Sequence, residues 1–440
     1  MNWDEDTTVA PKPASSTSGL VSALGGNVFM LGLTSFFTDL SSEMIYPLLP
    51  VFIAGLAPAA AVPMYIGLMD GIAESTSSLL KIIAGRLSDR WGKRKPLVVW
   101  GYSLSSLARP MTALAFAGWH VIALRFFDRI GKGLRSSPRD ALLSDSVDSR
   151  VRGTAFSFQR LMDHAGAVTG PLAAMALLYA MLGKTILWRH GQVSATAAEM
   201  HALRVVFGIA VIPGIAAVTV LITRVREDIR RIGSSGDNSA RNVVGGSHLP
   251  KSFYVYLGAV TLFTLGNSTD LFLIYYTRSM LGLGIGWMIV LWILLHLSKI
   301  LFSMPGGRLS DTIGRRRAIF IGWLIYSAVY WLMPYARNLP AVCVLLFVYG
   351  AYYGMTEGAE RALVADYVPP EIRGKAYGLY HGAVGFAALP ASFLFGVFWM
   401  RLGPVTAFHI GALLAAASIV LLFLSGTPDK KPELRHFKSL

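Results

Sequence analysis

The stretch Gly85-Arg86-Leu87-Ser88-Asp89-Arg90-Trp91-Gly92-Lys93-Arg94-Lys95 recurs later in the chain as Gly307-Arg308-Leu309-Ser310-Asp311-Thr312-Ile313-Gly314-Arg315-Arg316-Arg317. The two copies share their first five residues, a later glycine and a closing cluster of three basic residues. Each copy lies between apolar stretches long enough for a helix of roughly 20 residues, the length that crosses a membrane. A repeated polar loop between such stretches predicts a duplicated, membrane-embedded chain.

Shorter identities accompany the two copies in the same order along the chain. They pair Ala141-Leu142 with Ala362-Leu363, Arg152-Gly153 with Arg373-Gly374, and Thr38-Asp39-Leu40 with Thr269-Asp270-Leu271. Two similar halves on either side of a polar centre are the layout of transporters built from repeats.

The composition excludes several other classes of protein. Of the 440 residues, 54% are hydrophobic and only 15% are charged, and the mean hydropathy is +0.52. A soluble domain carries about 25% charged residues, so a soluble enzyme and a disordered chain are excluded. Cys343 is the only cysteine, which excludes an intramolecular disulfide and a cysteine-based metal cluster.

Reading along the chain predicts twelve membrane spans in two groups of six. They lie near 27–54, 64–85, 96–117, 120–142, 153–182, 203–223, 253–277, 285–306, 318–336, 341–364, 374–399 and 404–425. The fourth and tenth spans carry charges and should score poorly by hydropathy alone, so the count rests partly on the repeat.

We therefore predict an all-α integral membrane protein with two six-helix halves. Between the halves, Gly233-Ser234-Ser235-Gly236 and Gly245-Gly246-Ser247 are typical of a flexible linker. The predicted parts are a tail at 1–26, a first bundle at 27–223, a linker at 224–252, a second bundle at 253–425 and a tail at 426–440.

The distribution of basic residues predicts the orientation. Lys and Arg gather in the loops after spans two, six and eight and in the C-terminal tail, whereas the loop Gly55–Pro63 after span one has no charge. Basic loops face the cytoplasm, so both termini are predicted to lie there. The net charge of +15 then reflects topology, and nucleic acid is not an expected partner. Acidic residues near the start argue against a secretory signal.

These features together resemble the major facilitator superfamily over the whole chain. The Gly85–Lys95 loop is similar to that family's best-known signature between spans two and three, and its copy stands between spans eight and nine. Gly166, Gly170 and Pro171 of span five resemble a further signature, commonest in exporters of the antiporter type. Arg129 and Gly133 have the spacing of the fourth-span signature, but Lys132 stands where a glutamine is usual. The stretches 35–43 and 129–145 resemble a group of poorly characterised prokaryotic permeases, which implies a prokaryotic inner membrane and gives no substrate.

The resemblance implies that the two loops act as latches. In the family, the loop Asp meets the start of a span in the opposite half, here Asp89 near Arg373 and, by the repeat, Asp311 near Arg152. A carboxylate at a helix N-terminus contributes about 0.3–1 kcal/mol when exposed. Ordinary basic flanks with a solvated Asp are the alternative. The residues concerned are Gly85, Asp89, Arg90, Gly92 and Arg94 in the first copy, and Gly307, Asp311, Gly314 and Arg316 in the second.

Ionisable residues inside the predicted spans are the candidates for function, because charges at the bilayer centre are costly and normally face a partner. Asp39 and Glu43 lie four apart on span one, and Asp70 and Glu74 do so on span two, so each pair shares a helix face. Spans four and five carry further groups on common faces: Arg125, Asp128, Arg129, Lys132, Arg160, Asp163 and His164. The simplest arrangement pairs carboxylates of spans one and two with arginines of spans four and five.

Three interpretations of this cluster stay open. The ion pairs could only fix helix packing, they could include one or two carboxylates that bind and release a proton, or Arg125 and Arg129 could hold an anionic substrate. Glu74 and Asp39 are the first candidates for proton coupling.

The second half has fewer charges. Its candidates are Asp270, His296, Lys299 and Glu357, with Asp270 as one possible partner for Lys299, which has no acceptor of its own. Aromatic residues of spans seven, eight and ten could line a cavity for an organic molecule or anchor the spans at the interface: Tyr275, Tyr276, Trp287, Trp292, Tyr352 and Tyr353.

The predicted function is secondary active transport of a small organic solute by alternating access, with protons as coupling ion. Export by exchange with protons is favoured over proton-linked uptake of an organic anion or metal chelate, and over an uncoupled facilitator. No phosphate-binding loop, metal constellation or nucleophile elbow is present in the sequence, so we expect neither direct ATP use, nor an enzyme, nor a cofactor. A receptor or scaffold on the same fold is the alternative from another class. The expected partners are the bilayer, the solute and protons, with a monomer as the working unit.

Overall fold

The computed structural model describes residues 17–91, 93–147, 152–188, 195–227, 249–368 and 372–426. Throughout these ranges the regular structure is helical, with no strand. Residues 228–248 of the linker predicted at 224–252, residues 1–16 and 427–440 of the predicted tails, and Gly92 lie outside the described residues.

The first half is built from the helices that the repeat predicts. They are α1 (Thr17–Glu43), η1 (Tyr46–Leu48), α2 (Leu49–Ala54), η2 (Ala59–Ala61), α3 (Val62–Trp91), α4 (Lys95–Met111), η3 (Thr112–Leu114), α5 (Gly118–Asp145), α6 (Arg152–Leu187), α7 (Ala197–Ile209) and α8 (Val211–Arg224). Span one combines α1, η1 and α2, and span six combines α7 and α8. Helix α1 begins at Thr17, inside the stretch predicted as a tail.

The second half repeats this order of long helices. They are α9 (Lys251–Gly266), α10 (Leu271–Leu281), α11 (Ile285–Ile313), α12 (Arg315–Leu332), η6 (Met333–Tyr335), α13 (Leu339–Tyr367), α14 (Arg373–Leu402) and α15 (Pro404–Leu424). Span seven combines α9 and α10. The twelve-helix fold in two six-helix halves is confirmed.

Hydropathy separates the first four spans from the rest. Eight helical segments of the described chain are long and apolar enough to cross a membrane, and they correspond to spans five to twelve. The prediction of a poor score is right for the charged fourth span, α5, and wrong for the tenth, α13, whose best window stays apolar with a mean hydropathy of 1.5. The charges of α13 lie toward one end, which leaves an uncharged window long enough to pass.

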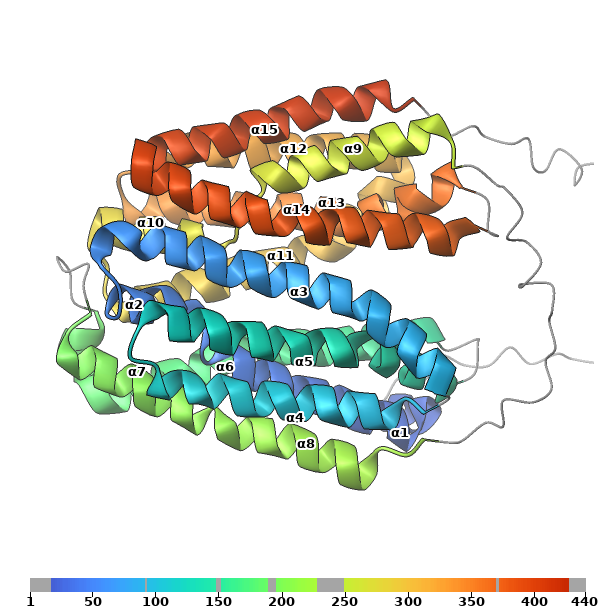
Figure 1. The fold of residues 1–440 in the computed structure, drawn as a ribbon, viewed down its shortest axis with the longest axis horizontal. Coiled ribbons are helices and arrows are strands. Elements are labelled where there is room, and N and C mark those ends of the chain that lie inside the picture. The colour runs from blue at the N-terminus through green and yellow to red at the C-terminus, as the bar shows by residue number, and fades with distance from the viewer. Residues whose placement is uncertain are drawn as a thin grey trace, which may run out of the picture.

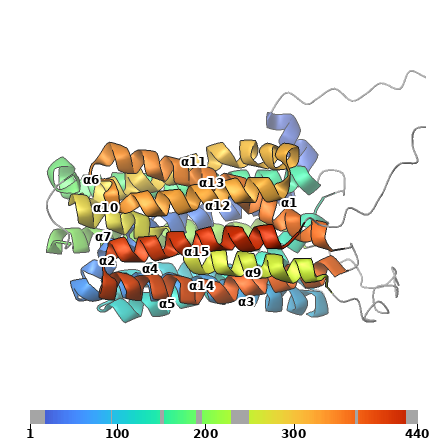
Figure 2. The same ribbon diagram turned by 90° about the horizontal axis from the view of Figure 1, so that it is seen from above.

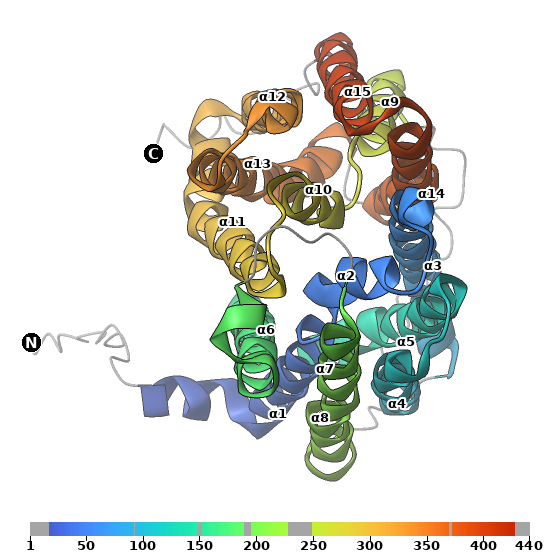
Figure 3. The same cartoon turned by 90° about the vertical axis from the view of Figure 1, so that its left-hand side faces the viewer.

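The two halves lie side by side with their long axes roughly parallel (Figure 1, Figure 2). Seen from one end, α3 lies beside α14 and α6 lies near α11, while α2 and α10 occupy the middle between the halves (Figure 3). We call the end that carries residues 91–95 and 313–315 the motif end, and the opposite end the far end.

The halves touch at the far end and separate toward the motif end. Close contacts between α3 and α14 run from Pro63 against Gly396 to Ser78 against Gly385, where a Cβ on Gly385 would lie 2.5 Å from that of Ser78. Nearer the motif end, a Cβ on Gly378 or Gly382 would meet nothing within 4 Å. Figure 1 shows the two ribbons diverging in the same direction. The structure is thus closed at the far end and open at the motif end.

Span seven is interrupted in mid-membrane. Helix α9 ends at Gly266 and α10 begins at Leu271, which leaves Asn267–Asp270 outside both helices. Non-helical backbone at membrane depth needs partners from the protein or from a water-filled cavity. The side chains that form hydrogen bonds with residues 267–270 define one side of the candidate site.

Candidate functional site

A buried charge centre holds three spans of the first half together. Asp128 of α5 accepts from Arg109 Nε of α4 at 2.8 Å and from Arg125 Nη1 at 3.0 Å, and its side chain is 3% exposed. Arg109 Nη1 also donates to the backbone oxygen of Thr38 in α1, at 2.8 Å. Asp128 therefore has its counter-charges in place, which supports a structural role. Arg109 was not among the predicted residues, although a single arginine inside an apolar span indicates a buried charged partner.

The expected pairing of carboxylates on spans one and two with arginines on spans four and five is wrong within the described residues. Asp70 accepts instead from the hydroxyl of Tyr46 at 2.9 Å. Arg160 of span five reaches Glu357 of span ten in the other half at 3.5 Å. The reason is that Arg109 and Arg125 are already used by Asp128, which the helical spacing alone did not reveal.

Several ionisable side chains of the first half stay without such partners. Within the described part, no side-chain hydrogen bond or ion pair joins Asp39, Glu74, Lys132 or Asp163 to another residue. Arg129 comes no closer than 3.9 Å to Asp128, and its buried Nε has no hydrogen bond. Lys132 nevertheless lies close enough to both Glu74 and Asp39 to interact with their charges. Asp39, Glu74, Lys132 and Asp163 therefore carry side-chain charges that no direct contact fixes within the described residues.

Tyr46 links the two halves near the far end. Its hydroxyl lies 3.5 Å from that of Thr269 in the span-seven break, and its ring packs edge-on against Trp292 of α11 at 5.2 Å between centroids. Arg125 stacks over the same ring at 4.4 Å. One turn away, Glu43 accepts from Trp292 Nε1 at 3.0 Å. Span one thus contacts the second half through a carboxylate and a tyrosine.

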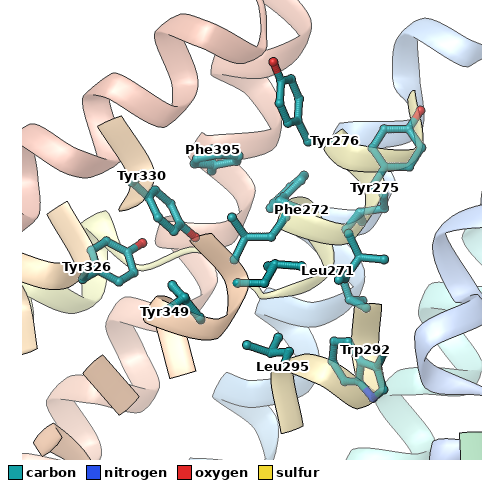
Figure 4. Packing of buried hydrophobic residues seen from close by; sticks show 14 of the residues in the cluster. Leu271, Phe272, Tyr275, Tyr276, Trp292, Leu295, Tyr326, Tyr330, Tyr349 and Phe395 are labelled. Carbon is teal, nitrogen blue, oxygen red and sulfur yellow. The ribbon is translucent and has the colours of Figure 1, made fainter. Parts of the chain in front are cut away.

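Tyrosine hydroxyls form hydrogen bonds with the polar groups at the break in span seven. Asn267 Nδ2 donates to Tyr352 at 3.0 Å, Ser268 lies 2.9 Å from the hydroxyl of Tyr330, and Tyr326 donates to Gly266 O at 2.9 Å. Figure 4 shows Tyr326, Tyr330 and Tyr349 together on one side of Leu271 and Phe272, with Trp292 on the other. The sequence analysis named Tyr352 but not the other tyrosines. Their spacing on spans nine and ten, at i and i+4 or i+3, was the available signal.

The predicted pair of Asp270 and Lys299 is present. Lys299 Nζ donates to Asp270 Oδ2 at 2.5 Å, and Tyr349 donates to the other carboxylate oxygen at 2.7 Å. The ammonium group also lies 4.4 Å from the centre of the Tyr353 ring. His296, one turn before Lys299, places Nδ1 3.1 Å from the backbone oxygen of Trp292. Asp270 therefore has a full set of partners.

The aromatic residues predicted to line a cavity or to anchor the interface are mostly buried. Tyr276 and Tyr352 are buried in the packing of the second half, and Trp292 is buried where that half meets span one. Tyr275 lines a pocket of about 250 Å³ at the far end, together with Pro63, Trp399 and Pro404. Trp287 stacks edge-on against Trp188 of the first half. Their burial against other helices removes them from the lipid boundary.

One ion pair joins the halves toward the motif end. Glu357 of α13 accepts from Arg160 at 3.5 Å and from Arg361 at 3.1 Å. The Arg160 side chain is 57% exposed, so this contact is solvated, as expected where the halves separate. His164 lies one turn further along α6, close to both Arg160 and Asp163.

Each motif loop is tied to its own half by the same two contacts. Arg94 pairs with Asp145 at the end of α5, and Arg315 pairs with Asp366 at the end of α13. The next residue in each loop caps the last span of that half. Lys95 donates to Val225 O at 2.7 Å after α8, and Arg316 donates to Leu422 O at 2.6 Å in α15. A basic side chain at a helix C-terminus stabilises the exposed carbonyl groups.

No group of three or more His, Cys, Asp or Glu side chains within the described ranges could hold a metal ion.

Comparison with known proteins identifies the family. The family model of the Major Facilitator Superfamily matches residues 31–298 and 255–439. The chain belongs to the major facilitator superfamily. An uncharacterised MFS-type transporter of Methanocaldococcus jannaschii is 32% identical over 91% of this chain and 95% of its own length. The chain is therefore a membrane transporter of that superfamily.

Two further comparisons are more limited. The multidrug resistance protein MdtH of Cronobacter sakazakii is 30% identical, but over only 35% of this chain and 37% of its own length. The crystal structure of a D-xylose-proton symporter covers 95% of this chain and is itself fully covered, with a TM-score of 0.69 and 17% identity. At that identity the likeness shows the superfamily fold alone.

The latches that the superfamily implies stay a prediction. The side chains of Asp89, of residues 152–154 and of residues 373–375 lie outside the described residues, and so does Gly92. Asp311 is exposed and forms no ion pair within the described part. A Cβ on Gly85 would lie at an ordinary 3.4 Å from that of Ser137, and one on Gly307 would meet nothing within 4 Å. The separation of the halves at this end explains the open space beside Gly307.

The span-five glycines of the superfamily signature are placed directly against α1. A Cβ on Gly166 would lie 2.9 Å from that of Asp39, and one on Gly170 would lie 2.9 Å from that of Glu43. Pro171 follows within the same helix. These glycines therefore fix the spacing between α6 and the helix that carries both carboxylates.

Proposed function

We propose that the protein exports a small organic solute in exchange for protons, by alternating access of its two halves. The observation that carries the proposal is the contrast between two sets of carboxylates. Asp128 and Asp270 have direct cationic partners, whereas Asp39, Glu74 and Asp163 have no hydrogen bond or ion pair within the described chain. A carboxylate in the membrane without a fixed counter-charge can respond to its surroundings by taking up a proton.

The contacts between the halves support alternating access. They gather at the far end, and the motif end is open. Basic residues in the motif loops favour the cytoplasmic side for that end. In this orientation, the structure represents the state open to the cytoplasm, from which an exporter takes its substrate.

Two observations favour export in exchange for protons over proton-linked uptake. The chain carries Gly166, Gly170 and Pro171, which resemble a signature commonest in exporters of the antiporter type, and one partial relative carries the name of a multidrug resistance protein. The competing function is proton-linked uptake of an organic anion. The guanidinium of Arg129, without a hydrogen bond at its buried Nε, is the feature that favours this alternative.

Liposomes that hold the purified protein and a pH-sensitive dye test the proposal. A panel of organic cations and anions is added, and proton movement is compared with that in protein-free liposomes. Protons that move opposite to an added compound support the proposal, and protons that enter together with an organic anion support the uptake alternative. Labelled compounds that cross without proton movement would contradict proton coupling.

The variant Glu74→Gln tests the assignment of the coupling group. We expect proton-driven uphill transport to be lost while substrate binding survives, because glutamine keeps the shape and polarity but cannot exchange a proton. Asp366→Asn, at an exposed ion pair, is the matched control and should transport normally. Unchanged uphill transport in Glu74→Gln would remove Glu74 from the mechanism.

A further inference from the structure

Helices α1 and α6 approach each other most closely beside Asp39. A Cβ on Gly166 would lie 2.6 Å from the backbone oxygen of Phe36, and one on Gly170 would lie 2.7 Å from that of Leu40. Such distances are shorter than real Cβ contacts, so these two positions of α6 accept only glycine at this spacing. The two backbones are therefore held in direct contact along the length that carries Asp39 and Glu43.

Asp163 lies on the same face of α6 as these glycines. It precedes Gly166 by three residues, nearly one helical turn, on the side of the motif end. Asp163 therefore lies on the face of α6 that packs against α1, nearly one helical turn from the level of Asp39. The charges of Asp163, Lys132, Glu43 and Arg109 all lie near enough to act on Asp39.

One carboxylate oxygen of Asp163 has no donor. Its Oδ1 is buried and makes no hydrogen bond. A buried acceptor without a donor costs about 1–3 kcal/mol and calls for an explanation in a native structure. A proton carried by a neighbouring carboxyl group would supply that donor.

The other charged groups around the two carboxylates mostly have partners of their own. On the side of Asp39, Arg109 of α4 donates to Asp128 and Glu43 of α1 accepts from Trp292. On the side of Asp163, Arg139 of α5 is bonded to Asp140 and Ser35, and His164 follows on α6 itself. Lys132 of α5 is a further cation near Asp39, and its ammonium group forms no hydrogen bond within the described part of the chain.

We propose that Asp39 and Asp163 share one proton, and that this pair is the proton-binding site of the transport cycle. This inference rests on the proposed proton coupling. One proton on two carboxylates leaves a single negative charge, which Lys132 balances. Proton binding adds H⁺ from water to one carboxylate, and its new O–H group donates to an oxygen of the other. Release returns H⁺ to water and leaves two negative charges side by side.

The position of the pair connects its charge to the closure of the far end. Helix α1 leads into the contacts of Glu43 and Tyr46 with Trp292. Helix α6 ends at Leu187, whose side chain contacts Gly286 of α11, and the next residue, Trp188, stacks against Trp287. Loss of the shared proton makes the two carboxylates repel and strains these contacts, which close the far end in this structure.

Infrared difference spectroscopy of the purified full-length protein between acidic and alkaline pH tests the shared proton. The readout is the C=O stretch of a protonated, buried carboxyl group. We expect the wild type to lose one such band as the pH rises. Asp39→Asn and Asp163→Asn should each lose that band entirely, because an asparagine amide donates in place of the proton and the remaining carboxylate stays ionised beside Lys132.

The double variant and a control make the test specific. Asp39→Asn combined with Asp163→Asn should lose no more signal than either single change, and Asp366→Asn should keep the wild-type band. If the double variant loses the sum of the band intensities lost by the single variants, each carboxyl group binds its own proton, and the proposal is overturned. A wild-type band in either single variant would overturn it too. If a single variant does not fold, Asp163→Glu, which keeps a carboxyl group, should retain the band, and its absence there would count against the pair.

The liposome assay separates this inference from the proposed function. If both single variants lose the infrared band but no transported compound moves protons, the proposed coupling is refuted and Asp39 and Asp163 still form a proton-binding site. Proton-coupled transport that persists unchanged in Asp39→Asn and Asp163→Asn would uphold the proposed function and overturn the role of the pair.

Discussion

Asp39 and Asp270 occupy equivalent places in the two halves, each in the triplet Thr-Asp-Leu, yet their surroundings differ in kind. Asp39 lies within an unbroken helix and within the described residues has no direct partner. Asp270 stands at a helix break and accepts from Lys299 at 2.5 Å and Tyr349 at 2.7 Å. A duplicated sequence therefore supplies two carboxylates, and their neighbours make one fixed and leave the other free.

The same difference extends over the whole of each half. The interior of the first half holds many charged groups, and glycines allow α6 to pack closely on α1. In the described part of the second half, tyrosine hydroxyls form hydrogen bonds with the polar groups of the interior, beside the ion pair of Asp270 and Lys299. A neutral hydroxyl group with all its hydrogen bonds formed keeps the same charge and the same partners as the pH or the ligand changes. We infer that the second half serves as the rigid partner and the first half as the one that responds to protons.

The largest effect is expected from Lys299→Met. Removal of one partner of a buried ion pair costs about 3–5 kcal/mol, because the other charge is left uncompensated. The matched variant in the first half, Lys132→Met, should cost less than Lys299→Met, since the Lys132 ammonium group has no hydrogen bond or ion pair to lose within the described residues. Thermal or denaturant unfolding in detergent micelles measures both. Equal costs would erase the contrast between the halves.

The spacing of α1 and α6 can be disturbed by Gly166→Ala. The added methyl group would force the helices apart, at a cost of about 1–3 kcal/mol. It should also weaken the infrared band that we assign to the shared proton. Gly382→Ala is the control, because a Cβ there meets nothing within 4 Å and alanine favours a helix by about 1 kcal/mol. A Gly166→Ala variant as stable as the control would show that the contact is loose.

The hydroxyl network of the second half is tested by Tyr352→Phe. This change removes the acceptor for Asn267 and should cost about 0.5–1.5 kcal/mol of unfolding free energy. Tyr254→Phe, at a side chain that is 51% exposed, should have no measurable effect. The proton band should stay as in the wild type in both variants. A changed band in Tyr352→Phe would mean that the halves are coupled through this network.

The smallest effects are expected at the motif loops. Asp145→Asn and Asp366→Asn each remove a half-exposed ion pair, with 50% and 38% of the Asp side chain exposed, and each should cost less than about 1 kcal/mol. Both losses should shrink further in high salt. Because the two pairs are equivalent, unequal costs would reveal an asymmetry between the halves that their geometry does not show.

The sequence by itself determined the membrane class, the duplication and the approximate positions of the helices. These depend on long apolar runs and on a repeated loop, which can be read without any tertiary contact. It also determined that Lys299 needs an acceptor, and Asp270 was a sound candidate, because a lysine inside a membrane has few alternatives.

The tertiary structure decided which charges are paired. Helical spacing placed Arg125, Asp128 and the other groups of α5 on shared faces, but it could not show that Arg109 from another span completes the centre around Asp128. It also could not show that Gly166 of α6 packs directly against Asp39 of α1. Spacing along one helix fixes only the direction of a side chain. Whether a buried carboxylate meets a cation, a hydroxyl or another carboxylate depends on the neighbouring helix, and only the packed fold supplies that neighbour.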